Sequence, residues 1–179
     1  IVIIGILIVY TNLLKMKPNC IIAARAGSKR IINKNIKKIF DKPLISYPIT
    51  LSVKSNLFKN TYVSTDSEKI KKIAENFGAK VPYLRSKKLS TNKIGLKEVI
   101  LDFIKRNKLE HEDFFVFIYA TAALLTKNTL KKSIDKFIKT KSDLLLPIQE
   151  FESNPLKSFK IINKKQIVFN QKKYFQGIQ

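Results

Sequence analysis

Small and positively charged residues follow the first strand-like segment of the chain. Residues 20–24 (CIIAA) form a short apolar run, and residues 25–30 (RAGSKR) follow at once. An apolar run that ends in a small-residue turn predicts a buried strand and then a loop. Small side chains let a ligand approach backbone N–H groups, and cations at a strand's carboxyl end suit a polyphosphate. The candidate phosphate ligands are the side chains of Arg25, Lys29 and Lys34 and the backbone amides of Ala26, Gly27 and Ser28.

This loop matches neither of two common phosphate-binding motifs. It lacks the G-x-x-x-x-G-K-[ST] spacing of a Walker A loop and the second and third glycines of the dinucleotide fingerprint. The pattern alone therefore indicates an anion-binding loop of no assigned type. The alternative interpretation is an ordinary polar turn between a strand and a helix in a lysine-rich protein.

Strands and helices alternate along the chain on both sides of this loop. Thr65 and Glu68 have the spacing of a capping box, so we expect Thr65 to cap a helix that ends before Gly78. Pro48 fits only the first turn of its helix. The predicted strands are residues 20–24, 60–64, 80–83, 114–119 and 143–148, the predicted helices are 44–57, 65–77, 94–106 and 130–138, and residues 159–162 and 166–169 form a hairpin.

The alternation of strands and helices favours a parallel sheet. The expected fold class is α/β, with a Rossmann-like, mostly parallel open sheet and helices on both faces. In such sheets ligands bind at the carboxyl ends of the strands, which is where the cationic loop begins.

The loop also resembles the opening motif of the CMP-sugar synthetases, the acylneuraminate cytidylyltransferase family. The family pattern runs I-P-A-R-G-G-S-K-R-I-P-x-K-N, followed soon by G-K-P-L-I. Ala26 stands where the family usually has glycine, and its Cβ restricts the loop if this residue needs a positive φ. Ala23, Ile32 and Asp41 are the other differences, and the matches are Ala24, Arg25, Gly27, Ser28, Lys29, Arg30, Ile31, Lys34, Asn35 and residues 42–45.

The resemblance continues to the last residue. Residues 63–66 (VSTD) and 78–85 (GAKVPYLR) resemble family motifs, and residues 119–123 (YATAA) are most similar to the pseudaminic acid branch of the family. The resemblance implies nucleotide contacts from Ala24, Asn35, Arg85 and Thr121. Without it, Asp66 is best interpreted as a residue that interacts with a helix dipole, and Thr121 as one that satisfies backbone donors.

The function implied by the resemblance is nucleotidyl transfer. CTP and an acidic nine-carbon sugar, of the pseudaminic or sialic acid type, would give a CMP-sugar and pyrophosphate, in a fold of the nucleotide-diphospho-sugar transferase type. The resemblance also implies Mg²⁺, with no ligands assigned, and a homodimer for the full-length protein. Family members continue past the position of Gln179, so we expect the C-terminal part of the domain to be missing. A CTP-binding chain without turnover and a basic nucleic-acid-binding α/β domain are the alternatives.

The formal net charge of +22 invites the nucleic-acid alternative. Of the 35 basic residues, only Arg25, Arg30, Arg85 and Arg106 are arginine, and the lysines are spread along the whole chain. Nucleic-acid surfaces more often show clustered cations with aromatic residues between them. We therefore expect a solvated basic surface and no nucleic-acid partner. One cysteine, Cys20, and one histidine, His111, give no basis for a disulfide or a zinc cluster.

Residues 1–15 begin with an almost wholly apolar stretch. It is shorter than the roughly 20 residues that cross a bilayer, and it has no basic segment before it and no small-residue cleavage site after it. We interpret residues 1–15 as an extraneous leader, with a short membrane anchor as the minority alternative, and residues 16–179 as the cytidylyltransferase domain. This interpretation predicts a cytoplasmic protein without a membrane partner.

Overall fold

The structure is a computed structural model of the chain. It describes residues 6–9, 17–28, 30–91, 93–109, 114–148, 159–162 and 166–169. The chain divides into two compact units, residues 1–147 and 148–179, and each unit is described by itself. His111 lies outside the described residues.

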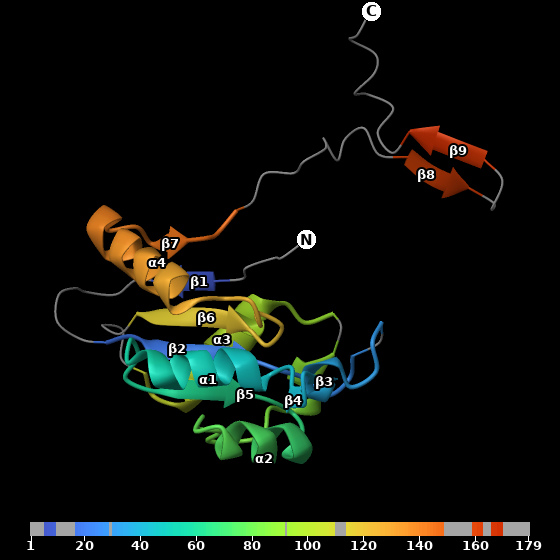
Figure 1. The fold of residues 1–179 in the computed structure, drawn as a ribbon. Helices are drawn as coiled ribbons and strands as arrows, with labels where there is room; N and C mark the ends of the chain where they lie inside the picture. The colour runs from blue at the N-terminus through green and yellow to red at the C-terminus, as the bar shows by residue number, and fades with distance from the viewer. Residues whose placement is uncertain are drawn as a thin grey trace, which may run out of the picture. The chain divides into compact units, whose positions relative to one another are not determined.

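A five-stranded sheet organises the first unit, in the order β5-β2-β6-β1-β7 (Figure 1). β2 (Asn19–Ala23) lies between β5 (Thr61–Ser64) and β6 (Phe115–Tyr119) and is parallel to both. β1 (Ile6–Val9) lies between β6 and β7 (Leu144–Leu145) and is antiparallel to both. β5, β2, β6 and β7 therefore run in one direction, and the prediction of a mostly parallel sheet is confirmed.

Helices cover both faces of this sheet, as predicted (Figure 1). Alternate residues of β2 and β6 point to opposite faces, because successive side chains of a strand do so. α1 (Ser46–Ser55), α2 (Glu68–Asn76) and α4 (Lys127–Thr140) pack in one apolar cluster with the residues of one face. α3 (Leu96–Arg106) packs on the other face, where Phe103 contacts the ring of Tyr62.

Local sequence signals set the ends of these helices. Pro48 lies in the first turn of α1, as expected, and Gly78 follows α2 with φ +88°. The predicted capping box is wrong, because Ser67 rather than Thr65 caps α2 and accepts a hydrogen bond from Ile70 N. The Thr65 hydroxyl instead accepts from Ser67 N, one residue before the helix begins.

Two predicted strands are shorter in the structure. Residues 80–83 form no regular strand: Lys80 forms an isolated bridge to Tyr62 of β5, and a second bridge joins Leu84 to Thr65, one residue beyond each segment. The strand predicted over residues 143–148 is reduced to Leu144–Leu145. Both predicted segments contain a proline, Pro82 and Pro147, which removes a backbone donor from a ladder.

A small hairpin was not predicted from the sequence. β3 (Lys38–Ile39) and β4 (Lys42–Pro43) pair antiparallel around Phe40 and Asp41, which both have positive φ, 47° and 64°. The sequence has no glycine or asparagine there to signal a tight turn. The Tyr47 hydroxyl, from the first turn of α1, donates to Ile39 O and holds the hairpin.

The apolar leader contributes β1, so part of it belongs to the sheet. Its four residues pair with β6 in register from Ile6–Ile118 to Val9–Phe115. The rest of residues 1–15 lies outside the described parts of the chain. None of the described helices is long and apolar enough to cross a membrane.

The second unit contains the predicted hairpin. β8 (Phe159–Ile162) and β9 (Gln166–Phe169) pair antiparallel, from Phe159–Phe169 to Ile162–Gln166. The turn between them, residues 163–165, is outside the described residues.

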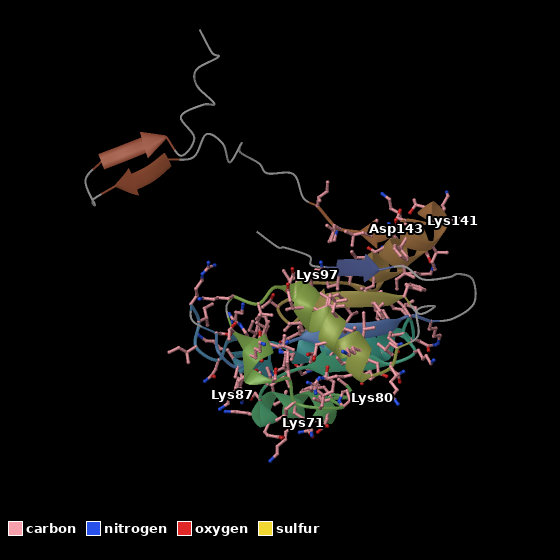
Figure 2. All side chains as sticks on the ribbon, turned by 180° about the vertical axis from the view of Figure 1, so that it is seen from behind. Lys71, Lys80, Lys87, Lys97, Lys141 and Asp143 are labelled. Carbon is pink, nitrogen blue, oxygen red and sulfur yellow. The ribbon has the colours of Figure 1, made fainter. Side chains whose placement is uncertain are left out.

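The lysines of the first unit are scattered rather than gathered. Figure 2 shows Lys71 on α2, Lys97 on α3 and Lys141 just after α4 on different sides of the body. Such a distribution fits the solvated basic surface expected from the sequence.

Candidate nucleotide site

A cavity of about 820 Å³ lies at the carboxyl ends of β2 and β6. Its volume falls in the usual range for small-molecule sites, roughly 300–1,000 Å³. Its walls come from the loop after β2, the first turn of α3 and the residues that follow β6. Ligands bind at this edge of open α/β sheets.

Cations dominate the polar lining of the cavity. Arg25, Arg30, Lys34 and Arg85 all line it, whereas its described lining contains no carboxylate. Converging positive charges without counter-charges repel one another and attract an anion. The cavity is therefore suited to a strongly negative ligand such as a polyphosphate.

Arg85 is the most unusual of these cations because it is buried, with 5% of its surface exposed. Its Nε donates to Ser90 Oγ over 3.1 Å, and it forms no ion pair with any described residue. Burial lowers the pKa of Arg85, the negative charge of Asp66 raises it, and the positive charge of Arg25 lowers it further. A buried cation without a paired anion is costly, so an anionic ligand would relieve it.

The main chain and an aromatic cluster fix the position of Arg85. Its N–H donates to Thr65 O over 2.7 Å, at the end of β5. Two residues earlier, Tyr83 donates to Asp102 on α3 and packs beside Phe103. Burial, followed by the negative charge of Asp102, raises the pKa of Tyr83 well above its usual value, which keeps the hydroxyl protonated as a donor.

Hydrogen bonds within the loop and to Asp66, outside it, hold the loop after β2. Ala26 N donates to Asp66 Oδ1 over 2.9 Å, and Ser28 N donates to Ala26 O over 2.8 Å. Two of the three amides expected to meet a phosphate therefore have partners in the chain, and only that of Gly27 has no hydrogen bond to a described residue. Asn35, which is buried, donates from Nδ2 to Arg25 O over 3.0 Å.

The alanine in place of the family's glycine causes no strain in this loop. Ala26 is not among the described residues with positive φ. The restriction expected from its Cβ therefore does not arise in this conformation.

The first turn of α3 and the end of β6 complete the walls. Gly95 precedes α3 without a side-chain cap, and both Gly95 and Leu96 line the cavity. Uncapped amides at a helix N-terminus carry partial positive charge, which Glu98 in the first turn of α3 offsets in part. Tyr119 ends β6 with 41% of its surface exposed and lines the same cavity.

The structure brings together most of the residues predicted for the site. Ala24 is an exception, because it is 1% exposed, belongs to the apolar core and donates its N–H to Ser64 O. Ala26 lines a smaller cavity beside the loop, Gly27 lines neither cavity, and Lys29 lies outside the described residues. The predicted residues that line the large cavity are Arg25, Ser28, Lys34, Asn35, Arg85 and Thr121.

Arg30, Tyr119 and Gly95 also line the cavity but were not assigned to the site from the sequence. Arg30 was visible as a cation of the motif, and Tyr119 as the last residue of a predicted strand. Gly95 gave no signal, because only the tertiary fold turns the start of α3 toward the loop.

The described residues do not provide a metal site of their own. They contain no group of three or more His, Cys, Asp or Glu side chains that could hold an ion. Asp66, the carboxylate beside the loop, already accepts the Ala26 amide through Oδ1. Mg²⁺ prefers one or two carboxylates together with substrate phosphates, and the described lining offers no carboxylate.

The sequence that forms this cavity matches a known protein family. A model of the cytidylyltransferase family matches residues 19–176. The chain belongs to the cytidylyltransferase family. Its described cavity lies within the matched residues.

Individual relatives agree with this assignment. A pseudaminic acid cytidylyltransferase of Campylobacter jejuni is 38% identical over 162 residues, which are 89% of this chain and 70% of that protein. A CMP-N,N'-diacetyllegionaminic acid synthase of Legionella pneumophila is 32% identical over 124 residues, 67% of this chain and 53% of that protein. Both proteins are therefore longer than the segment they share with this chain.

A solved structure shows the same fold. The CMP:2-keto-3-deoxy-manno-octonic acid synthetase complexed with CTP has a TM-score of 0.58 and 15% identity. The match covers 69% of this chain and 48% of that one. The α/β fold predicted from the sequence is thus shared with this solved structure.

Proposed function

We propose that this chain binds CTP in the cavity and transfers its cytidylyl group to an acidic nine-carbon sugar of the pseudaminic or sialic acid type. The products are a CMP-sugar and pyrophosphate. The proposal rests most directly on buried Arg85, which has no ion pair among the described residues and lines a cavity that Arg25 and Lys34 also line. Family membership and the names of the relatives support cytidine as the nucleotide and a nonulosonic acid as the acceptor.

The chemistry is substitution at the α-phosphorus. The anomeric hydroxyl of the sugar attacks in line, a bond forms between its oxygen and the α-phosphorus, and the bond to the β-phosphate oxygen breaks. The hydroxyl loses its proton and pyrophosphate leaves. The contributions of the chain are positioning and charge neutralisation, which dominate catalysis of such transfers.

Four cations are assigned to parts of the nucleotide in this proposal. Arg25 and Lys34, and Lys29 of the motif, neutralise the triphosphate, while Arg85, Asn35 and Thr121 contact the nucleotide. Arg25 and Lys34 come from the two ends of one loop and line the same cavity, so both could contact a triphosphate bound there. Arg85 comes from the other side of β5, through its bond to Thr65.

We also propose that Mg²⁺ accompanies the nucleotide, where it would supply further positive charge to the phosphates. The described lining has no carboxylate to hold the ion. The roles assigned to the cationic side chains therefore do not depend on it. A cytoplasmic location and a homodimer belong to the same proposal, and sedimentation of the protein would test the dimer.

Thermal shift measurements test the nucleotide. A ligand that binds only the folded state raises its melting temperature, so CTP should raise it more than ATP, GTP or UTP at equal concentration. Equal shifts for all four would leave an anion site and remove the claim for cytidine.

A pyrophosphate-release assay then tests the reaction. With CTP and a panel of nonulosonic acids, pyrophosphate should appear with one acid and should decrease when Arg25 is replaced by alanine. Lys131→Ala is the matched control, because Lys131 is an exposed cation on α4 that pairs with Asp135. CTP binding without pyrophosphate release would instead support a chain that binds nucleotide without turnover.

A further inference from the structure

Three consecutive residues at the end of β5 hold both sides of the candidate site. Ser64 O accepts Ala24 N over 3.0 Å, where the loop leaves β2, and Thr65 O accepts Arg85 N over 2.7 Å. Asp66 then accepts Ala26 N through Oδ1 over 2.9 Å. The end of β5 therefore fixes the anion loop, residues 25–28, and Arg85 relative to each other.

The Asp66 contact differs from the other two because a side chain makes it. Asp66 is not needed to cap α2, since Ser67 Oγ accepts Ile70 N at that position. Nor does Asp66 form an ion pair with any residue that the structure describes. Its hydrogen bond to Ala26 reaches the middle of the anion loop, 40 residues earlier in the chain.

The charge of Asp66 opposes anion binding. Asp66 is close enough to Arg85 to raise the pKa of that guanidinium, so it also repels a polyphosphate placed among the same cations. A carboxylate beside an anion site strengthens anion binding only if the hydrogen bond it accepts raises the affinity more than its negative charge lowers it. The geometric contribution visible here is the fixed position of Ala26 N.

We propose that Asp66 is a positioning residue, which holds the anion loop in the shape that binds polyphosphate by accepting the Ala26 amide. This inference rests on the proposed function, because it assumes that the loop binds the phosphates of a nucleotide. The hydrogen bond strengthens binding and the negative charge weakens it. Substitutions that separate these two effects test the proposal.

Asp66→Asn and Asp66→Ala form the informative pair. Both remove the charge, but only asparagine keeps an acceptor oxygen at the same distance along the side chain. With inorganic pyrophosphate as the probe, calorimetry should show that Asp66→Asn binds about three- to tenfold more tightly than Asp66→Ala, the value of one neutral hydrogen bond. Asp66→Asn should also bind at least as tightly as the wild type, because the repulsion is gone.

Asp66→Glu supplies a second test that does not depend on the alanine variant folding. It keeps the charge and moves the carboxylate by one methylene, so it should bind pyrophosphate several-fold more weakly than the wild type. Asp135→Asn and Asp135→Ala, on exposed α4, are the matched controls and should bind as the wild type does. Equal affinities for Asp66→Asn and Asp66→Ala, or a wild-type affinity for Asp66→Glu, would overturn the proposal.

The failure of this inference can be told apart from failure of the proposed function. Pyrophosphate binding that follows the Asp66 series, in a protein that does not prefer CTP, would leave the positioning role and remove the cytidylyl transfer. If the enzyme instead prefers CTP but its pyrophosphate affinity does not change with the residue at position 66, the proposed function would stand and the positioning role would be removed.

Discussion

Replacement of Arg85 by methionine should stabilise the protein while it weakens nucleotide binding. Methionine has a similar length and can fill the same buried space without a charge. The wild-type residue is 5% exposed, and its guanidinium has one hydrogen bond, to Ser90 Oγ, among the described residues. The substitution thus removes a buried cation that no described carboxylate pairs.

Two opposing effects on stability follow from the surroundings of Arg85: the loss of a hydrogen bond and the loss of a desolvation penalty. Loss of the bond to Ser90 costs about 1.5–3 kcal/mol, as for hydrogen bonds of charged groups. Removal of the buried charge also removes its desolvation penalty, which raises the free energy of unfolding by several kcal/mol when the ion is buried without a partner. A net stabilisation of about 1 kcal/mol would raise the melting temperature by roughly 2–4 °C in a chain of this size. CTP affinity should fall about ten- to a hundredfold, because a charge-assisted contact to the ligand is lost.

Differential scanning fluorimetry and calorimetry with CTP measure the two changes. Arg106→Met is the control, since Arg106 is an exposed arginine that pairs with Asp102 and lies over the Tyr83 ring. It should leave CTP affinity unchanged and should not raise the melting temperature. A lower melting temperature for Arg85→Met, with CTP affinity within about twofold of the wild type, would show that Arg85 is a structural residue and would refute the reasoning.

Three further predictions concern the fold. Gly78→Ala should lower the free energy of unfolding by about 1 kcal/mol or more in urea titrations. Gly78 has φ +88°, and the added Cβ would lie 3.3 Å from Val53 Cγ1. Gly27→Ala is the control and should cost almost nothing, because its added Cβ would have no atom within 4 Å. Cys20 should react with a thiol reagent only on unfolding, because burial raises its pKa to about 12 and leaves almost no thiolate in the folded protein at neutral pH; rapid labelling of the native protein would contradict this. Deletion of residues 1–10 should produce self-association in sedimentation experiments, because it exposes the backbone edge of β6; an unchanged mass and melting temperature would instead favour the interpretation of the leader as extraneous.

Local patterns were sufficient to predict the main elements and the cationic loop, whereas Asn35, Arg85 and Thr121 were assigned to the site through the family resemblance. The run before Arg25 and the run of residues 114–119 were predicted as buried strands, and both lie inside the sheet. The loop cations followed from their spacing alone, since a strand end, small residues and a cationic loop are consecutive in the sequence. Two local features were still missed: the turn of the β3–β4 hairpin has no glycine or asparagine to signal it, and Ser67 rather than Thr65 caps α2.

The sequence by itself determined which residues carry the positive charge and that they follow a buried strand, because both facts are properties of neighbours along the chain. Only the tertiary structure decided which of them share a cavity. It placed Arg85 opposite the loop through Thr65, turned the start of α3 into the same cavity, and removed Ala24 to the core. In the tertiary structure the Ala26 amide donates a hydrogen bond to Asp66, and β1 of the apolar leader lies between β6 and β7. These outcomes depend on hydrogen bonds between segments far apart in sequence, and the strand and helix periods that predict local structure carry no information about such pairings.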